Sequence, residues 1–152
     1  MSERAPALVR PAEPDDAAEI ARVSRLARTE AMPWLPDLHS PDDDLRFFRA
    51  TVDRESTWVA LVGHEVVGFV CVDGEQVDHL YVAPDHQGHG IGTELLSVAK
   101  GLGTQRLRLW AFQRNEPARA FYAHHGFGEV ELTDGDGNEE REPDVCLEWT
   151  RD

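Results

Sequence analysis

The chain has 152 residues, of which 41% are hydrophobic and 29% charged, so wholesale disorder is excluded and a core can form without a metal or a disulfide. Asp and Glu number 29 against 15 Lys and Arg, which gives a formal net charge of −14, and no basic stripe runs through the sequence. We therefore expect no nucleic-acid partner and no anionic membrane partner, whereas cationic partners such as amines would be attracted at low salt.

Export signals and membrane spans are not evident in the sequence. No apolar run approaches the roughly 18 residues that a membrane span needs, and Met1-Ser2-Glu3-Arg4 leads into no apolar signal segment. The two cysteines, Cys71 and Cys146, lie in separate apolar runs and are interpreted as reduced core thiols. We expect a cytoplasmic protein with a single domain over residues 1–152.

The first third of the chain predicts one short strand and two helices. The strand covers residues 8–10, and Asp16 and Glu19 have capping-box spacing at the start of the first helix. Residues 28–39 contain two prolines and are expected to be irregular. Ser40 predicts the start of the second helix, because a proline and three acidic residues follow it.

The rest of the chain predicts mostly strands, interrupted by two helices. The expected strands are 58–62, 66–72, 77–82, 107–112, 130–132 and 145–149, and the expected helices are 91–100 and 117–125. Three strands without helices between them should pair antiparallel, and the later crossovers imply some parallel pairing. The predicted fold is α/β (α+β), with a mixed, largely antiparallel central sheet of about seven strands flanked by about four helices.

The most informative segment runs from Val77 to Thr93. Here a strand is followed by a proline-marked loop, by Gly88, Gly90 and Gly92, and then by a helix. Glycines let a ligand approach the backbone, and the helix start offers unpaired N–H donors at the positive end of a dipole. This pattern predicts an anion cradle suited to a diphosphate, the alternative being a turn whose glycines serve only tight geometry. The spacing G-x-G-x-G matches neither the dinucleotide fingerprint nor a Walker loop.

The same residues carry a resemblance to a known family. Gln87-x-x-Gly90-x-Gly92, preceded by Leu80-Tyr81-Val82-x-Pro84, resembles the acyl-CoA signature of the GNAT superfamily of N-acetyltransferases. A second block of that family is similar to the downstream set Asn115, Ala118, Phe121-Tyr122 and Gly126-Phe127. The resemblance extends over nearly the whole chain, is most specific from 77 to 127, and is weak over 31–40 and the last twenty residues.

The resemblance implies a GNAT-like fold and an enzyme that moves an acetyl group from acetyl-CoA to an amine by direct attack in a ternary complex. It implies that the segment Gln87, Gly88, His89, Gly90, Ile91, Gly92 and Thr93 wraps the diphosphate of the cofactor. Backbone groups of Leu80, Tyr81 and Val82 would pair with the amides of the pantetheine arm, as an added strand does. Asn115 would bond to the arm, with N-capping of the next helix as its alternative or additional role.

Two residues are the catalytic candidates. Tyr122 stands four residues before Gly126, as the family's general acid does, and a phenol can protonate the departing thiolate. The alternative for Tyr122 is a tyrosine of the core. Asp78 is the candidate base, on the expectation that it shares a strand face with Leu80 and Val82. His79, Asp144 and Glu75 stay open as bases, and Asp78 could instead bind a cationic acceptor.

The acceptor is expected to be a small-molecule or peptide amine, recognised by residues 28–39 and 134–144. Met32, Trp34 and Leu35 would wall a pocket there or pack on the sheet edge. No metal is expected, because the histidine spacings match no ligand pattern and the calcium-like run from Asp134 lacks the required Gly and Glu. Two other functions stay open, a non-catalytic acyl-CoA-binding or sensing domain and an interaction module without cofactor. The family contains monomers and dimers, so a homodimer is possible.

Overall fold

The computed structural model describes residues 6–152, and the segment Met1-Ser2-Glu3-Arg4 lies outside them. Within this part of the chain the strands are β1 (Leu8–Pro11), β2 (Ser56–Val62), β3 (Glu65–Asp73), β4 (Gln76–Val82), β5 (Arg106–Phe112), β6 (Gly128–Leu132) and β7 (Asp144–Thr150). The helices are α1 (Ala17–Ala31), α2 (Pro41–Arg54), α3 (Ile91–Lys100) and α4 (Glu116–His124), with short 3-10 turns at Pro14–Asp16 and Pro84–His86. The predicted fold class and the order of elements are confirmed.

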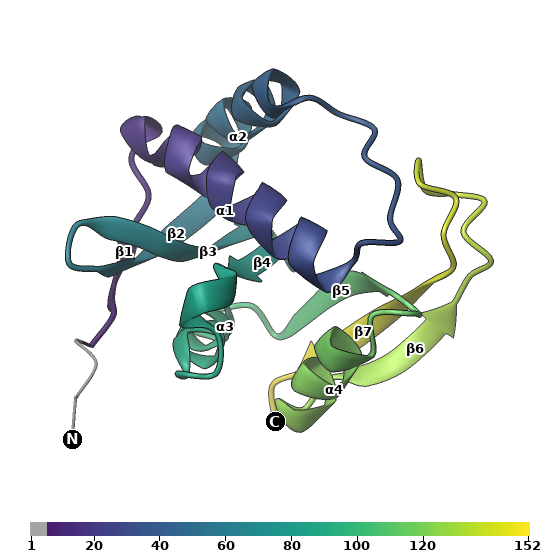
Figure 1. The fold of residues 1–152 in the computed structure, drawn as a ribbon. Helices are drawn as coiled ribbons and strands as arrows, with labels where there is room; N and C mark the ends of the chain where they lie inside the picture. Colours follow the sequence, from purple (N-terminus) through teal and green to yellow (C-terminus); the bar gives the residue numbers. More distant parts are fainter. Residues whose placement is uncertain (1–5) are drawn as a thin grey trace.

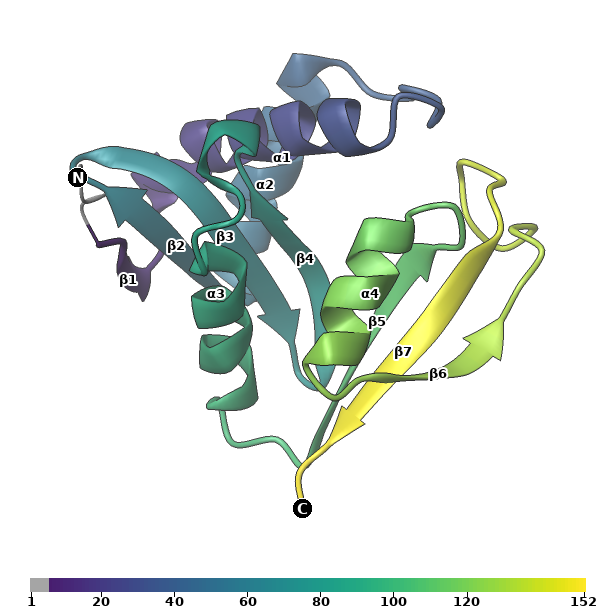
Figure 2. The ribbon, with the colours of Figure 1, turned by 60° about the horizontal axis from the view of Figure 1, so that its bottom comes forward.

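All seven strands belong to one sheet, in the order β1-β2-β3-β4-β5-β7-β6. Every neighbouring pair is antiparallel except β4 and β5, which are parallel and share a single register position, Gln76 opposite Arg108. Beside it, the Arg108 amide donates to the Glu75 carbonyl over 2.8 Å. Beyond this point the two strands separate, as Figure 2 shows, so the middle of the sheet is open toward the carboxyl ends of β4 and β5.

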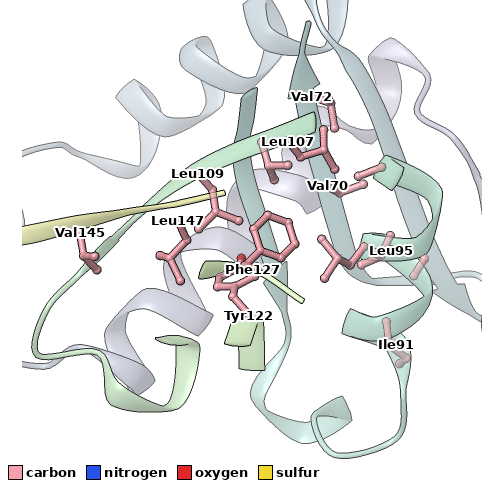
Figure 3. Close-up of a cluster of buried hydrophobic side chains, with 14 of the residues drawn as sticks. Val70, Val72, Ile91, Leu95, Leu107, Leu109, Tyr122, Phe127, Val145 and Leu147 are labelled. Carbon is pink, nitrogen blue, oxygen red and sulfur yellow. The ribbon is translucent and has the colours of Figure 1, made fainter. Parts of the chain in front are cut away.

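Helices cover both faces of the sheet. α1 and α2 lie together on one face, and α3 and α4 lie on the other (Figure 1). Strand β3 is buried on both sides: Phe69 belongs to the cluster under α1 and α2, whereas Val70 belongs to the cluster under α3. The second cluster continues from α3 across to α4 and β7, where Tyr122 and Phe127 join it (Figure 3).

The helix starts follow local capping chemistry, with one correction to the sequence analysis. Ser40 accepts from the Asp43 amide and the Asp43 carboxylate accepts from the Ser40 amide, so the predicted start of α2 is confirmed. The predicted Asp16/Glu19 capping box is wrong. The Asp16 carboxylate instead accepts from the Arg10 guanidinium at 2.8 Å and from the Glu13 amide at 2.7 Å. The Arg10 partner holds the pKa of Asp16 below its usual range.

Both cysteines are buried and free of a disulfide, as predicted. None of the helices in the described part of the chain has the length and apolar character needed to cross a bilayer. The cellular compartment stays a prediction.

Leu95 tests the α3 packing on which the β4–α3 turn depends. Its side chain is fully buried in the cluster between α3 and β3, whereas Leu102, just after the helix, is 38% exposed. Leu95→Ala should lower the free energy of unfolding by about 2–5 kcal/mol, since it removes transfer energy and leaves a cavity. Leu102→Ala is the matched control and should cost far less. Urea unfolding checks both, and equal costs would contradict the packing described.

Candidate functional site

The turn between β4 and α3 presents backbone N–H groups outward. Gly88 and Gly90 have φ of 80° and 83°, a left-handed conformation that other residues adopt only with strain. Gly90 is the N-cap of α3, and the first amide beyond it that bonds back to the turn is that of Glu94, which donates to the Gly90 carbonyl over 3.0 Å. The earlier amides at the start of α3 lack intrahelical partners, so they are free to bind an anion.

The Gln87 side chain ties this turn to the end of β4. Its Nε2 donates to the Val82 carbonyl oxygen over 2.9 Å, so the amide group holds the turn in position. This role was missed by the sequence analysis, which assigned the whole residue to the cofactor. The only sequence feature connected with this contact is that Gln87 follows the last residue of β4 by five positions. No general rule of turn chemistry predicts a hydrogen bond from that spacing.

A cavity of about 420 Å³, here called the α3 cavity, lies beside the turn, between β4, α3 and α4. The predicted cofactor residues that line it are Leu80, Tyr81, Val82, Gln87, Gly88, Gly90, Ile91, Gly92, Thr93 and Asn115. His89 is the exception, because it is exposed and does not line the cavity. The buried Ala27 and the exposed Ala31 of α1 also line it and were not predicted, since nothing in their local sequence distinguishes them from other alanines of the helix.

A narrow hollow of about 100 Å³, here called the slot, opens where β4 and β5 separate. It shares Leu80, Tyr81, Asn115, Ala118 and Tyr122 with the α3 cavity. On its other side it shares Trp110, Ala111 and Phe112 with a third hollow of about 430 Å³, here called the β5 hollow. The slot lies in the gap between the two parallel strands and shares wall residues with each of the other two spaces. This row of three adjoining spaces is here called the passage.

Backbone groups of β4 face the slot. The Ala83 amide donates to the Val67 carbonyl of β3 over 2.7 Å, and alternate residues of a strand direct their backbone groups to opposite neighbours. The backbone N–H and C=O groups of Leu80 and Val82 consequently point toward β5, which is no longer paired with β4 at these positions. Apart from the Val82 carbonyl held by Gln87, they are available to a ligand.

Tyr122 lies where the α3 cavity meets the slot. Its ring is packed against Phe121 and Phe127, with centroids 5.2 and 5.5 Å away, and the residue is 9% exposed (Figure 3). Burial raises the pKa of its phenol, so the hydroxyl stays protonated at neutral pH. Tyr122 therefore belongs to the core cluster and also lines the cavity wall, and its role as the general acid stays a prediction.

Asn115 is the N-cap of α4. Its Oδ1 accepts from the Ala118 amide over 3.3 Å, which confirms the capping role. The residue also lines both the α3 cavity and the slot. Capping fixes the side chain in place while its amide nitrogen stays available to a ligand.

Asp78 does not follow the strand alternation that the sequence analysis assumed. His79 is opposite Cys71 and Val77 is opposite Val72, so Asp78 is the extra residue of a β-bulge. Its carboxylate lies with those of Glu55 and Asp73, all within 4.8 Å of one another. Asp78 lines the slot but not the α3 cavity. Its role as a base stays a prediction.

Burial and mutual repulsion change the protonation of this acidic group. Burial raises the pKa of Glu55 to about 7, with the Asp78 carboxyl as the next cause, and burial also raises the pKa of Asp78. Glu55 Oε1 is buried without a hydrogen-bond partner in the described part of the chain. The three carboxyls could hold a cation by their spacing, but the raised pKa of Glu55 lowers the charge of the group, and the cluster alone does not define a metal site.

The alternative bases lie in three different environments. Burial lowers the pKa of His79 to about 4, and the ring is surrounded by Phe47, Phe48 and Phe69. His79 is therefore neutral at pH 7 and a weak proton acceptor. Glu75 pairs with Arg106 at 3.1 Å and lines neither the slot nor the α3 cavity. Asp144 lines the β5 hollow.

The two loops predicted to recognise the acceptor lie side by side (Figure 1). His39 of the α1–α2 loop and Glu139 of the β6–β7 loop are joined over 2.8 Å, a contact that raises the pKa of His39. Trp34 packs edge-on against Phe112 of β5, with centroids 6.0 Å apart, and the Arg114 guanidinium lies 4.2 Å from the Trp34 ring centroid. Trp34 thus packs at the end of β5, which is an inner strand and not an edge of the sheet, while Met32 lines the slot.

Comparison with known proteins identifies the family. The acetyltransferase (GNAT) domain family matches residues 53–129, just over half of the chain. The peptidyl-lysine N-acetyltransferase YjaB of Salmonella typhimurium is 39% identical over 75 residues, which cover 46% of this chain and 48% of that protein. The match covers 43–54% of the length of four curated relatives and 69% of an uncharacterized N-acetyltransferase of Archaeoglobus fulgidus.

Two solved structures have the same fold. A GCN5-related N-acetyltransferase from Rhodopseudomonas palustris superposes with a TM-score of 0.80 at 23% identity, covering 99% of both chains. The PaiA N-acetyltransferase of Thermoplasma acidophilum, solved in complex with coenzyme A, gives 0.74 at 18% identity and covers 96% of this chain and 99% of that one. The chain therefore belongs to the GNAT acetyltransferase family, and the resemblance seen in its sequence is confirmed.

The raised pKa of Glu55 predicts a pH-dependent stability. A carboxyl whose pKa is about 7 when folded and near 4.5 when unfolded stabilises the protein below pH 4.5 and loses this contribution as pH rises through 7. Glu55→Gln should therefore gain stability over the wild type at about pH 8 relative to about pH 5, on the order of 1 kcal/mol after allowing for solvent screening. Urea unfolding at both pH values measures it.

The matched control is Asp53→Asn, in the last turn of α2 just before Glu55, because Asp53 is exposed and lies outside the acidic group. Its stability difference from the wild type should be the same at both pH values. A pH-independent difference for Glu55→Gln as well would mean that Glu55 is ionised throughout this range.

Proposed function

We propose that this protein transfers an acetyl group from acetyl-CoA to a primary amine, which attacks the thioester directly in a ternary complex. The observation that carries the proposal is the passage through the gap between β4 and β5. A cofactor in the α3 cavity and an acceptor in the β5 hollow would meet in the slot, beside Tyr122. The coenzyme A bound by the PaiA relative of Thermoplasma acidophilum and the peptidyl-lysine acceptor in the name of YjaB support the two substrate classes.

The phosphates of the cofactor would bind the turn at the start of α3. The fold and family fit the cofactor, since the turn offers free amides from Gly88 to Thr93 and the adjoining cavity shares Leu80 and Tyr122 with the slot. Within residues 6–152 no Arg or Lys lines this cavity. A chain of net charge −14 would therefore hold a polyanion by backbone dipoles rather than by basic side chains.

The pantetheine arm would extend along β4 as an added strand. Backbone groups of Leu80 and Val82 would bond to its amides, because β5 does not use them. Asn115, fixed by its capping bond, would donate its amide nitrogen to the arm. These contacts would bring the thioester to Tyr122.

The reaction needs a proton acceptor and a proton donor. An ammonium acceptor would lose a proton to a carboxylate, and its nitrogen would then form a bond to the thioester carbon as the carbon–sulfur bond breaks. Tyr122, kept protonated by burial, would give its proton to the departing thiolate. It would regain a proton from solvent, to which the new amide nitrogen releases its surplus proton. Asp78, whose raised pKa makes it a better base near neutral pH, would accept the amine proton through water.

Tyr122→Phe tests the assigned acid and separates catalysis from a purely cofactor-binding function. The rate of thiol release from acetyl-CoA with an active amine should fall by about a hundredfold or more, since general acids contribute about 10²–10⁴-fold. The affinity for CoA, measured by calorimetry, and the free energy of unfolding should change little, because only the hydroxyl is removed. Unchanged turnover would show that another group protonates the thiolate.

Thiol release should report acetylation of the added amine with little background from acetylation of the protein itself. Lys100 is the only lysine of the chain, and its Nζ donates to the His125 carbonyl over 2.7 Å, so acetylation of the protein by itself should be slight. A panel of small amines and a lysine peptide should include at least one acceptor. No turnover with any amine, together with normal CoA binding, would favour the sensing alternative.

Gly90→Ala tests the backbone cradle. No atom lies within 4 Å of the added methyl group, so the change acts only by straining the left-handed N-cap, by about 1–2 kcal/mol. The Kd for CoA should rise roughly tenfold as the amides move out of line. Gly63→Ala, in the β2–β3 hairpin with φ of 63° and equally open space, is the matched control. Equal Kd values for the two variants would remove the cradle from the account.

A further inference from the structure

The β5 hollow has the features of a binding site for a positively charged group. Its walls are Trp110, Ala111 and Phe112 of β5 on one side and the β6–β7 loop with Asp144 on the other. Trp110 alternates with the buried Leu107 and Leu109, so its ring is on the opposite face of the sheet from α3 and α4, and the residue is 43% exposed. The hollow is thus a mostly apolar space containing one carboxylate.

That carboxylate is oriented but carries no charge partner. Asp144 Oδ1 accepts from the Thr133 hydroxyl, and Oδ2 accepts from Asn138 Nδ2 over 3.2 Å. Both donors are neutral, and Asp144 forms no salt bridge with the residues described. The nearby Arg114 is used elsewhere, because it binds Glu142 at 2.9 and 3.1 Å and stacks on Trp34.

The surrounding loop strengthens the negative potential. Residues 133–143 contain five acidic residues and one basic residue, Arg141. Two of the acids are already paired, Glu139 with His39 and Glu142 with Arg114. Asp134 and Asp136 are exposed, so this end of the passage attracts cations.

We infer that the acceptor carries a second cationic group, separated from the reacting amine by a short apolar stem, and that Asp144 with Trp110 binds this group. The inference rests on the proposed function. With the reacting amine in the slot beside Tyr122, the stem would pass along Phe112, which lines both spaces. The second cation would bond to Asp144 and lie against the indole of Trp110, an arrangement that favours cations over neutral groups.

Asp144 is a specificity-determining residue in this account rather than a base. It is the first residue of β7 and lines the β5 hollow but not the slot where Tyr122 lies, and both of its oxygens are held by donors of the preceding loop. Its removal should therefore weaken acceptor binding and leave the chemical step alone.

The experiment compares diaminobutane with butylamine, which has the same stem and lacks the second amine. With acetyl-CoA, the wild type should use the diamine with a kcat/KM at least about tenfold higher, as hydrogen bonds to charged groups contribute at least this factor. Asp144→Asn keeps a partner for Thr133 and should raise the KM for the diamine by about tenfold, with kcat and the butylamine reaction unchanged. Trp110→Leu should reduce the same preference.

The matched control is Asp136→Asn, which removes the same charge from an exposed position of the same loop outside the hollow. It should leave the preference for the diamine intact. A loss as large as that of Asp144→Asn would mean that the general field of the loop, and not the site, recognises the cation.

Some results would refute the second cation site and leave the proposed transferase function intact. Equal use of diamine and monoamine, or equally good use of a peptide whose lone lysine has no basic neighbour, would refute a second cation site while the transferase activity stands. A matching loss of butylamine turnover in Asp144→Asn would assign Asp144 to the chemical step. If neither amine reacts, calorimetry of diaminobutane with the CoA-bound protein decides, and the absence of binding refutes the inference.

Discussion

The parallel pairing of β4 with β5 ends almost where it begins, and the site depends on this separation. One register position, Gln76 opposite Arg108, joins the two halves of the sheet. Beyond it, the backbone groups of Leu80 and Val82 have lost the neighbour that would bond to them, and a slot opens across the sheet. Unpaired strand groups are normally a liability, and here they become the surface along which an extended ligand can add itself.

The two faces of the sheet differ in the charge that they present to a ligand. On one face, α3 is anchored in the core through Ile91 and Leu95, and its free N-terminal amides offer positive potential in a strongly acidic protein (Figure 3). On the other face, the α1–α2 and β6–β7 loops meet through His39 and Glu139 and bring acidic side chains to the mouth of the passage. In the proposed function, an anionic cofactor and a cationic acceptor would thus be attracted to different faces of the sheet.

Much of this could be predicted from the sequence because local signals determine it. Capping at Ser40 and the left-handed glycines before α3 are properties of a few consecutive residues. The bulge at Asp78 could not be predicted, since it arises from the register between β3 and β4 and reverses the alternation on which its face was inferred. The same holds for two side-chain hydrogen bonds. The Asp16 carboxylate binds Arg10 instead of forming the predicted capping box, and the Gln87 side chain binds the end of β4. Residue spacing alone does not predict either contact.

The most direct test is calorimetric titration of the protein with CoA at low and at high salt. The backbone amides of the β4–α3 turn should bind one CoA per chain, and the affinity should not fall with added salt, because salt also screens the repulsion between an acidic protein and a polyanion. The account would be contradicted by the absence of binding. It would also be contradicted by an affinity that falls steeply with salt, as binding through basic side chains requires.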